Sequence, residues 1–130
     1  MAVDMNMNVL IVDDYNTMLR IIKNLLKQLG FKNIDEATDR AMAYEKIKGK
    51  DYGLVISDWN MEPMTGIEFL KLVRGDAGAK YQKTPFIMVT AESKTENVIA
   101  AKQAGVDNYI VKPFNAETLK QKIVSVIGDF

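Results

Sequence analysis

The fold class is decided by a pattern that begins with the stretch Val-Leu-Ile-Val-Asp-Asp at residues 9–14. Four branched apolar residues in a row, followed at once by polar ones, are typical of a strand that is buried on both faces of a parallel sheet. The same composition recurs in three further runs and, more weakly, in a fourth: residues 54–56, 86–89, 109–111 and 33–37. The chain therefore contains five candidate strands.

Segments with a helical period separate these strands. In the first segment, apolar residues at steps of three and four predict one buried face, made of Met18, Ile21, Ile22, Leu25, Leu26 and Leu29. Gly30 is expected to end that helix. The last segment repeats the pattern with Leu119, Ile123, Val126 and Ile127. Residues that favour a first turn precede each helix, namely Asn16, Asp39, Asn115 and the capping boxes at residues 65–68 and 93–96.

Strand and helix thus alternate five times, and no linker or low-complexity tract indicates a second domain. We therefore expect residues 1–130 to form a single domain. Such alternation predicts a parallel sheet with helices on both faces, and five units are too few for an eight-stranded barrel. The prediction is an α/β fold with an open, doubly wound parallel sheet of five strands. Sheets of this kind carry their sites at the carboxyl ends of the strands.

The composition narrows the chemistry that such a site can perform. The chain has no cysteine and no histidine, which excludes disulfides, thiolate metal sites, catalytic triads with histidine and imidazole acid–base catalysis. Its 17 basic and 17 acidic side chains cancel, so we expect neither a nucleic-acid partner nor attraction to an anionic membrane. Carboxylates, lysines, hydroxyls and metal ions with oxygen ligands remain available.

The N-terminal residues carry no targeting pattern. Residues 1–8 contain Asp4 and no basic residue, and the apolar run at residues 9–12 is too short for a signal peptide or a membrane span. The expectation is a cytoplasmic protein.

Polar side chains stand where four of the five strands end: Asp13 and Asp14, Asp58, Thr90, and Lys112. Three carboxylates at one edge repel one another unless a cation is present. Their charge of −3, with +1 from Lys112, is brought to zero by a divalent ion, and oxygen ligands favour Mg²⁺. A carboxylate beside a metal ion, an ammonium and a hydroxyl is equipped to accept a phosphoryl group.

Four motifs at these strand ends carry a family resemblance. They are residues 9–14, Ser-Asp-Trp-Asn-Met at 57–61, Val-Thr-Ala-Glu at 89–92 and Val-Lys-Pro-Phe at 111–114. Over essentially its whole length the chain resembles the receiver domain of two-component response regulators, and most closely the single-domain chemotaxis regulators. The resemblance implies a flavodoxin-like (βα)5 fold with strand order 2-1-3-4-5. It also implies a signalling protein that catalyses only its own phosphorylation and dephosphorylation.

The resemblance assigns roles to individual residues. Asp58 is the implied phosphoacceptor, and Asp14, Asp58 and the backbone carbonyl of Asn60 are the implied direct ligands of Mg²⁺. Asp13 would bind the ion through water. Lys112 would contact the phosphoryl group, and the amide of Ala91 would lie near the Thr90 hydroxyl.

The same resemblance implies a switch and an output surface. The Thr90 hydroxyl would move toward the phosphoryl oxygens and the Tyr109 ring would turn inward behind it. The surface that changes would be the fourth helix, the fifth strand and the fifth helix, with Lys94, Tyr109 and Lys122 as candidate partner contacts. Asn60, Glu92 and Glu62 would modulate the lifetime of the phosphoryl group. Glu62 departs from the family, because it stands where the pattern has proline and adds a negative charge.

The implied phosphodonor is a phosphohistidine on a sensor histidine kinase, which supplies the histidine that this chain lacks. A flagellar motor switch protein and a phosphatase are further expected partners of a monomer. Other outputs stay open: a phosphate sink that competes for the kinase, or the regulation of another protein.

Two other classes use a similar fold. A metal-dependent phosphohydrolase of the haloacid dehalogenase type requires Asp-x-Asp on its first strand, whereas here the two aspartates are adjacent. A flavin carrier requires a hydroxyl- and glycine-rich phosphate loop, where Asp13 and Asp14 would instead repel phosphate. The residues therefore favour the signalling switch over both.

Overall fold

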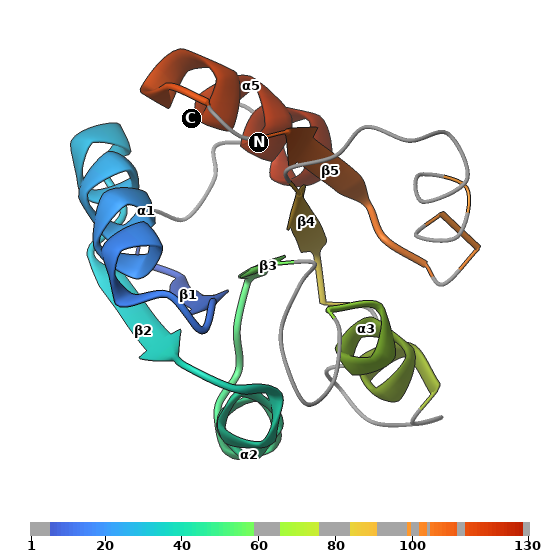
Figure 1. Ribbon diagram of the computed structural model, residues 1–130. Coiled ribbons are helices and arrows are strands. Elements are labelled where there is room, and N and C mark those ends of the chain that lie inside the picture. Colours follow the sequence, from blue (N-terminus) through green and yellow to red (C-terminus); the bar gives the residue numbers. More distant parts are fainter. Residues whose placement is uncertain are drawn as a thin grey trace.

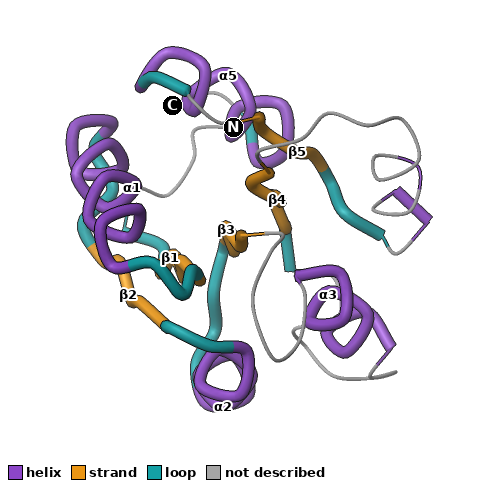
Figure 2. Tube along the Cα trace, viewed as in Figure 1, coloured by secondary structure: helices purple, strands orange, loops and turns teal. Residues whose placement is uncertain are grey.

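Each predicted apolar run forms a strand, and all five strands are parallel members of one sheet. The computed structural model describes residues 6–58, 66–75, 84–90, 99, 102–103, 105–111 and 114–128. Its strands are β1 (Asn8–Val12), β2 (Asn33–Ala37), β3 (Leu54–Asp58), β4 (Phe86–Thr90) and β5 (Asn108–Val111). They lie in the order β2-β1-β3-β4-β5, which confirms the predicted order (Figures 1 and 2).

Helices cover both faces of the sheet, as a doubly wound fold requires (Figure 1). The described helices are α1 (Asn16–Leu29), α2 (Arg40–Gly49), α3 (Gly66–Gly75) and α5 (Ala116–Ile127). One face carries α1 and α5, which contact each other, and the other carries α2 and α3. The fourth helix predicted before β5 lies mostly outside the described residues. None of the helices in the described ranges is long and apolar enough to cross a membrane.

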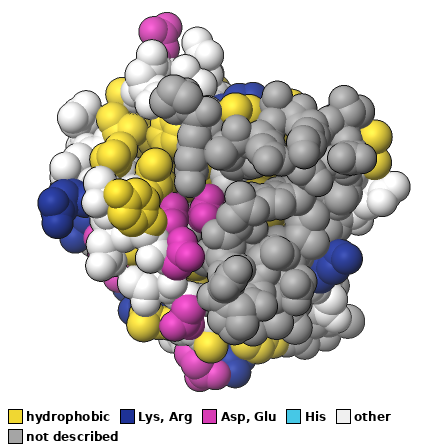
Figure 3. All heavy atoms as spheres, in the orientation of Figure 1, with side chains coloured by type: hydrophobic (Ala, Val, Ile, Leu, Met, Phe, Trp, Pro, Cys, Tyr) yellow, Lys and Arg dark blue, Asp and Glu magenta, His cyan; other side chains and the backbone are white. Residues whose placement is uncertain are grey.

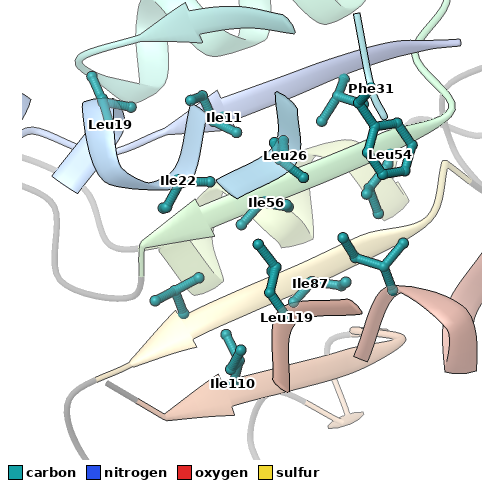
Figure 4. Packing of buried hydrophobic residues seen from close by; sticks show 13 residues of the cluster. Ile11, Leu19, Ile22, Leu26, Phe31, Leu54, Ile56, Ile87, Ile110 and Leu119 are labelled. Atoms are coloured by element: carbon teal, nitrogen blue, oxygen red, sulfur yellow. The ribbon is translucent and has the colours of Figure 1, made fainter. Parts of the chain in front are cut away.

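The strands are apolar on both sides because each side faces a separate core. Alternate residues of β1 belong to opposite cores, with Val9 and Ile11 facing α1 and α5 and Leu10 and Val12 facing α2 and α3. Figure 4 shows the first of these cores, in which side chains of α1 and α5 pack against the three central strands. The central strands β1, β3 and β4 are buried, whereas the outer strands β2 and β5 are partly exposed.

Two helix starts match their predicted caps and one does not. The side chains of Asp39 and Asn115 accept hydrogen bonds from the backbone N–H groups of Met42 and Thr118, both at 2.8 Å. The prediction of Asn16 as a cap is wrong, because Asn16 is already the first residue of α1 and Tyr15 holds the cap position. The capping boxes at residues 65–68 and 93–96 include residues outside the described ranges.

The buried face of α1 is rotated slightly from its prediction. Leu19, Ile22 and Leu26 are its buried residues, whereas Ile21 keeps 43% of its surface exposed. Leu19, Ile22 and Leu26 follow steps of three and four, so they lie on one stripe, and Ile21 falls at the margin of that stripe. Gly30 ends the helix as predicted, in the left-handed conformation with φ of 107°.

At the amino ends of β4 and β5 an arginine joins three segments, an arrangement that we call the arginine clasp (Arg74, Asp107, Phe86, Thr84 and Gly105). Arg74, in the last turn of α3, donates to the carbonyls of Thr84 and Gly105 at 2.7 and 3.0 Å and to Asp107 Oδ2 at 2.9 Å. The same Asp107 oxygen accepts the backbone N–H of Phe86 at 2.8 Å. Burial lowers the pKa of Arg74, and its charge interaction and hydrogen bond with Asp107 oppose that shift.

The outer strand β2 carries charged side chains that pair with lysines of neighbouring elements. Asp35 Oδ2 accepts from Lys50 Nζ at 2.9 Å and from the Tyr52 hydroxyl at 2.7 Å, and Glu36 pairs with Lys23 at 3.5 Å. Burial tends to raise the pKa of Asp35, but the two hydrogen bonds and the nearby lysine charges outweigh it and lower the pKa. Burial, and then the bond to Asp35, raise the pKa of the Tyr52 hydroxyl.

Candidate functional site

The candidate site forms where two central strands end side by side. β1 and β3 are neighbours in the sheet, with Val12 opposite Ser57. The next residue along each chain segment is an aspartate, Asp13 directly after β1 and Asp58 at the end of β3, so both lie at the carboxyl edge of the sheet. Asp14 follows in the connection to α1. The register therefore brings together three residues that are distant in sequence, as the strand-end pattern predicts.

The three carboxylates lie close enough to share one ligand. One oxygen from each of Asp13, Asp14 and Asp58 lies within 4.8 Å of the other two. Asp13 is 1% exposed and Asp58 is 6% exposed, whereas Asp14 faces solvent. Figure 3 shows acidic side chains gathered near the middle of the viewed face, beside exposed hydrophobic side chains. The group is thus a partly buried cluster that can be reached from solvent on the side of Asp14.

Backbone hydrogen bonds hold the first of these residues in place. The N–H of Asp13 donates to the carbonyl of Ala37 at 3.1 Å, which extends the pairing of β1 with β2 by one residue. Asp13 Oδ1 accepts the N–H of Tyr15 at 2.9 Å. This turn directs the chain into α1, whose cap residue Tyr15 makes no side-chain cap hydrogen bond. Asp13 therefore helps to start the helix and also contributes to the cluster.

The cluster fits a hard divalent cation. Three carboxylates concentrate a charge of −3 in a small volume, and two of them are largely removed from water. The burial of Asp13 and Asp58 and the repulsion among three negative charges are both unfavourable unless a positive charge compensates them. All the donors are oxygens, the ligand type that Mg²⁺ and Ca²⁺ prefer. The donor set is consistent with the magnesium predicted from the sequence.

The structure also places the predicted switch residues in the sheet. Thr90 is the last residue of β4, and the residue before it, Val89, lies opposite Asp58, so its backbone reaches the same edge as the cluster. Tyr109 lies on β5 opposite Met88 and is partly buried against the core that α2 and α3 cover. The Nζ atom of Lys122, on α5, is 5.1 Å from the centre of the Tyr109 ring.

Several predicted site residues fall outside the described ranges. They are Asn60, Glu62, Ala91, Glu92, Lys94 and Lys112. Their roles stay predictions from the resemblance.

Two residues near Tyr109 were missed by the sequence prediction. Asn108 Nδ2 donates to Ser125 Oγ at 2.6 Å, and Ser125 Oγ donates to the carbonyl of Lys122 at 2.6 Å. These residues are separated by 17 positions and meet only because α5 packs beside β5. The one local signal is a serine between two valines near the end of a helix, a setting in which the hydroxyl often bonds back to a carbonyl of the preceding turn.

Comparison with known proteins agrees with this arrangement. Residues 9–124 match the family described as response regulator receiver domain. The chain is 52% identical over 118 residues to "Chemotaxis protein CheY-3" of Vibrio cholerae serotype O1, which covers 91% of this chain and 89% of that protein. It is 49% identical over 120 residues to "Chemotaxis protein CheY" of Pseudomonas aeruginosa, covering 92% and 95% of the two chains.

A solved structure shows the same fold. The structure of the chemotaxis protein CheY4 of Vibrio cholerae superimposes with a TM-score of 0.86 at 35% identity, covering 93% of this chain and 98% of that one. The strand order of the sheet and the sequence similarity thus point to the same family. The chain belongs to the receiver domain family of response regulators, a family of signalling proteins, and its curated relatives at about half identity are chemotaxis proteins.

Proposed function

We propose that this chain is a phosphorylation-activated response regulator in a chemotaxis signalling pathway, and that residues 1–130 act as a single receiver domain. The observation that carries the proposal is the meeting of Asp58 with Asp13 and Asp14 at the end of two neighbouring strands. A lone aspartate at a strand end commonly caps a helix. Three that converge on one point, two of them buried, are more simply explained by a reaction with an anionic group that needs a cation.

Asp58 is the proposed phosphoacceptor. Its carboxylate oxygen forms a bond to phosphorus, while the bond from phosphorus to the donor nitrogen breaks and the nitrogen keeps the electron pair. The donor is a phosphohistidine on a sensor histidine kinase, since the chain itself has no histidine. Burial of Asp58 keeps the carboxylate poorly solvated, which leaves it a better nucleophile than an exposed one.

Asp14, Asp58 and the backbone carbonyl of Asn60 are the proposed direct ligands of Mg²⁺, and Asp13 is proposed to bind it through water. When bound, the ion would offset the negative charge of the cluster and of the incoming phosphoryl group. Lys112 is proposed to contact the phosphoryl oxygens. Glu62, Asn60 and Glu92 are proposed to set how long the phosphoryl group survives.

The output is proposed to run through Thr90 and Tyr109. A phosphoryl group on Asp58 replaces one charge by about −1.5 to −2 and adds strong acceptor oxygens. These acceptors attract the Thr90 hydroxyl on the neighbouring strand, and the Tyr109 ring follows. The surface formed by β5, α5 and the preceding segment, with Lys94 and Lys122, then changes its affinity for a partner. A flagellar motor switch protein is the proposed partner, because the relatives are chemotaxis proteins.

Small phosphodonors test the proposal directly. Incubation with acetyl phosphate and Mg²⁺ should add one phosphoryl group, seen as a mass shift of the intact protein. Asp58→Asn should abolish the shift, because an amide is a poor nucleophile. Asp51→Asn is the matched control, since Asp51 is an exposed aspartate before β3 and should leave labelling unchanged. Stoichiometric, acid-labile phosphate on the Asp58→Asn variant would disprove the assignment.

A further inference from the structure

Four residues of β5 and α5 form a closed ring of contacts that includes the proposed switch residue. The N–H of Tyr109 donates to Asn108 Oδ1 at 2.8 Å, and Asn108 Nδ2 donates to Ser125 Oγ at 2.6 Å. Ser125 Oγ donates to the carbonyl of Lys122 at 2.6 Å. The ammonium of Lys122 lies 5.1 Å from the centre of the Tyr109 ring and closes the ring of contacts. We call these four residues the β5–α5 ring.

The β5–α5 ring runs around the outer edge of β5 and so joins side chains on the two faces of the sheet. Ile110 faces the core that α1 and α5 cover, so the neighbouring side chain of Tyr109 points to the opposite face, where it packs against the other core. α5 lies on the Ile110 face, yet its Lys122 reaches the Tyr109 ring. That reach is possible because β5 is the last strand of the sheet. Lys122 therefore extends around the edge of β5 from one face to the other.

We propose that Lys122, Ser125 and Asn108 are positioning residues that hold the Tyr109 ring in its resting orientation. The inference rests on the proposed switch role of Tyr109. A cation within about 6 Å of an aromatic ring is attracted to the face of that ring, so it favours the ring orientation in which the contact is made. Any movement of the ring away from Lys122 loses this contact, and any movement of α5 changes where the ammonium lies.

The coupling acts in both directions. Phosphorylation must draw the Tyr109 ring away from Lys122, so Lys122 opposes the switch. A partner that engages the Lys122 ammonium removes the same contact and favours the switched orientation. By linkage, the switched orientation raises the affinity for that partner by the same factor. At a half-exposed site a cation–aromatic contact changes a population ratio about two- to fivefold.

The experiment observes the Tyr109 ring directly. Protein labelled with ¹³C in its tyrosine rings gives an NMR signal for Tyr109, identified by its loss in Tyr109→Phe. Its position is recorded without additions and with Mg²⁺ and beryllofluoride, which mimics the phosphoryl group. Lys122→Met keeps the length of the side chain and removes its charge. It should shift the resting signal toward the beryllofluoride position by about a two- to fivefold change in population ratio.

Three further variants make the result specific. Lys122→Arg keeps a cation over the ring and should restore the wild-type position. Ser125→Ala removes the hydrogen bonds from Asn108 to Ser125 and from Ser125 to the Lys122 carbonyl, and it should shift the signal in the same direction by a smaller amount. Lys27→Met makes the same charge change on an exposed position of α1 and should leave the signal in place.

The inference is overturned if Lys122→Met and Ser125→Ala both fold and leave the Tyr109 signal at its wild-type position, or if Lys122→Arg fails to restore it. Failure of the proposed function is seen separately. In that case acetyl phosphate does not label Asp58, while the comparison of resting signals still tests whether the β5–α5 ring positions Tyr109.

Discussion

At the carboxyl end of the sheet three carboxylates lie within 4.8 Å of one another, whereas at the amino end one guanidinium is matched to one carboxylate and two carbonyls. Both groups are partly buried, the cluster where β1 and β3 end and the arginine clasp beside the starts of β4 and β5. They differ in charge balance, since the cluster gathers −3 and the arginine clasp sums to zero. Like charges brought together weaken the folded chain, and opposite charges with satisfied hydrogen bonds support it. The unbalanced end is therefore the one that a bound cation would stabilise.

The largest expected effect is on metal binding at the unbalanced end. Asp14→Ala removes a proposed direct ligand, and we expect the affinity for Mg²⁺ to fall about 100-fold or more. This is the upper end of the losses seen when residues that hydrogen-bond to metal ligands are replaced. Trp59 follows Asp58 in the sequence, so its fluorescence should report the titration. Wild-type emission should change saturably at millimolar Mg²⁺. A variant that titrates like the wild type would show that Asp14 is not a ligand.

The second largest effect is on the free energy of unfolding, and it concerns the arginine clasp at the amino end of the sheet. Asp107→Ala leaves the Phe86 N–H and the Arg74 guanidinium without their carboxylate, and we expect the free energy of unfolding to fall by about 2 kcal/mol. Urea denaturation at unchanged m-value measures the loss. Glu45→Ala is the control. It breaks the ion pair between Glu45 and Lys48 on the surface of α2 and should lower the free energy of unfolding by only ~0.3 kcal/mol. Equal losses in the two variants would contradict the comparison.

A single charge removed from the cluster should raise stability. Without Mg²⁺, Asp13→Asn reduces the local charge from −3 to −2 and keeps an oxygen for the Tyr15 N–H. We expect the free energy of unfolding to increase by about 1 kcal/mol. Millimolar Mg²⁺ should stabilise the wild type through binding to the folded state and stabilise this variant less. A lower urea midpoint for Asp13→Asn in metal-free buffer would show that the cluster is not under repulsion.

The smallest effect is a pH dependence at a carboxylate that is already paired. Lys50, Tyr52 and Lys46 lower the pKa of Asp35 below its ordinary value of 3.8. A lowered pKa means that the folded state prefers the ionised form, so this contribution is complete above about pH 3.8 and is lost as the pH falls through the folded-state pKa. Asp35→Asn should cost about 0.5 kcal/mol at neutral pH. The difference should vanish in acid; a difference that persists there would point to packing instead of charge.

Much of this arrangement could be predicted from the sequence. The five strands and the convergence of Asp13, Asp14 and Asp58 follow from apolar runs that end in acidic residues, because parallel strands bring their carboxyl ends to one edge. The local sequence is enough to predict that each of these segments is a strand. The strand order needed the family resemblance in addition.

Other features depend on contacts between distant segments and could not be predicted in this way. The arginine clasp joins Arg74 to Asp107, which are 33 positions apart, and no periodicity relates them. The rotation of the buried face of α1 toward Leu19 depends on how the helix sits against the sheet and α5. The exact start of α1 could not be predicted either, since Asn16 already lies inside the helix and Asp13 accepts the N–H of Tyr15, the residue in the cap position.

The paired charges on β2 also bear on how this chain behaves beside copies of itself. β2 ends the sheet, and its outer side presents backbone groups to which a strand from another molecule could bond. Such a strand would have to pass over Asp35 and Glu36 with their lysine partners and remove water from both pairs. Growth of the sheet from one molecule to the next is therefore disfavoured at this side. The charged pairs of β2 therefore act against fibre formation through this edge when many copies of the chain are crowded together.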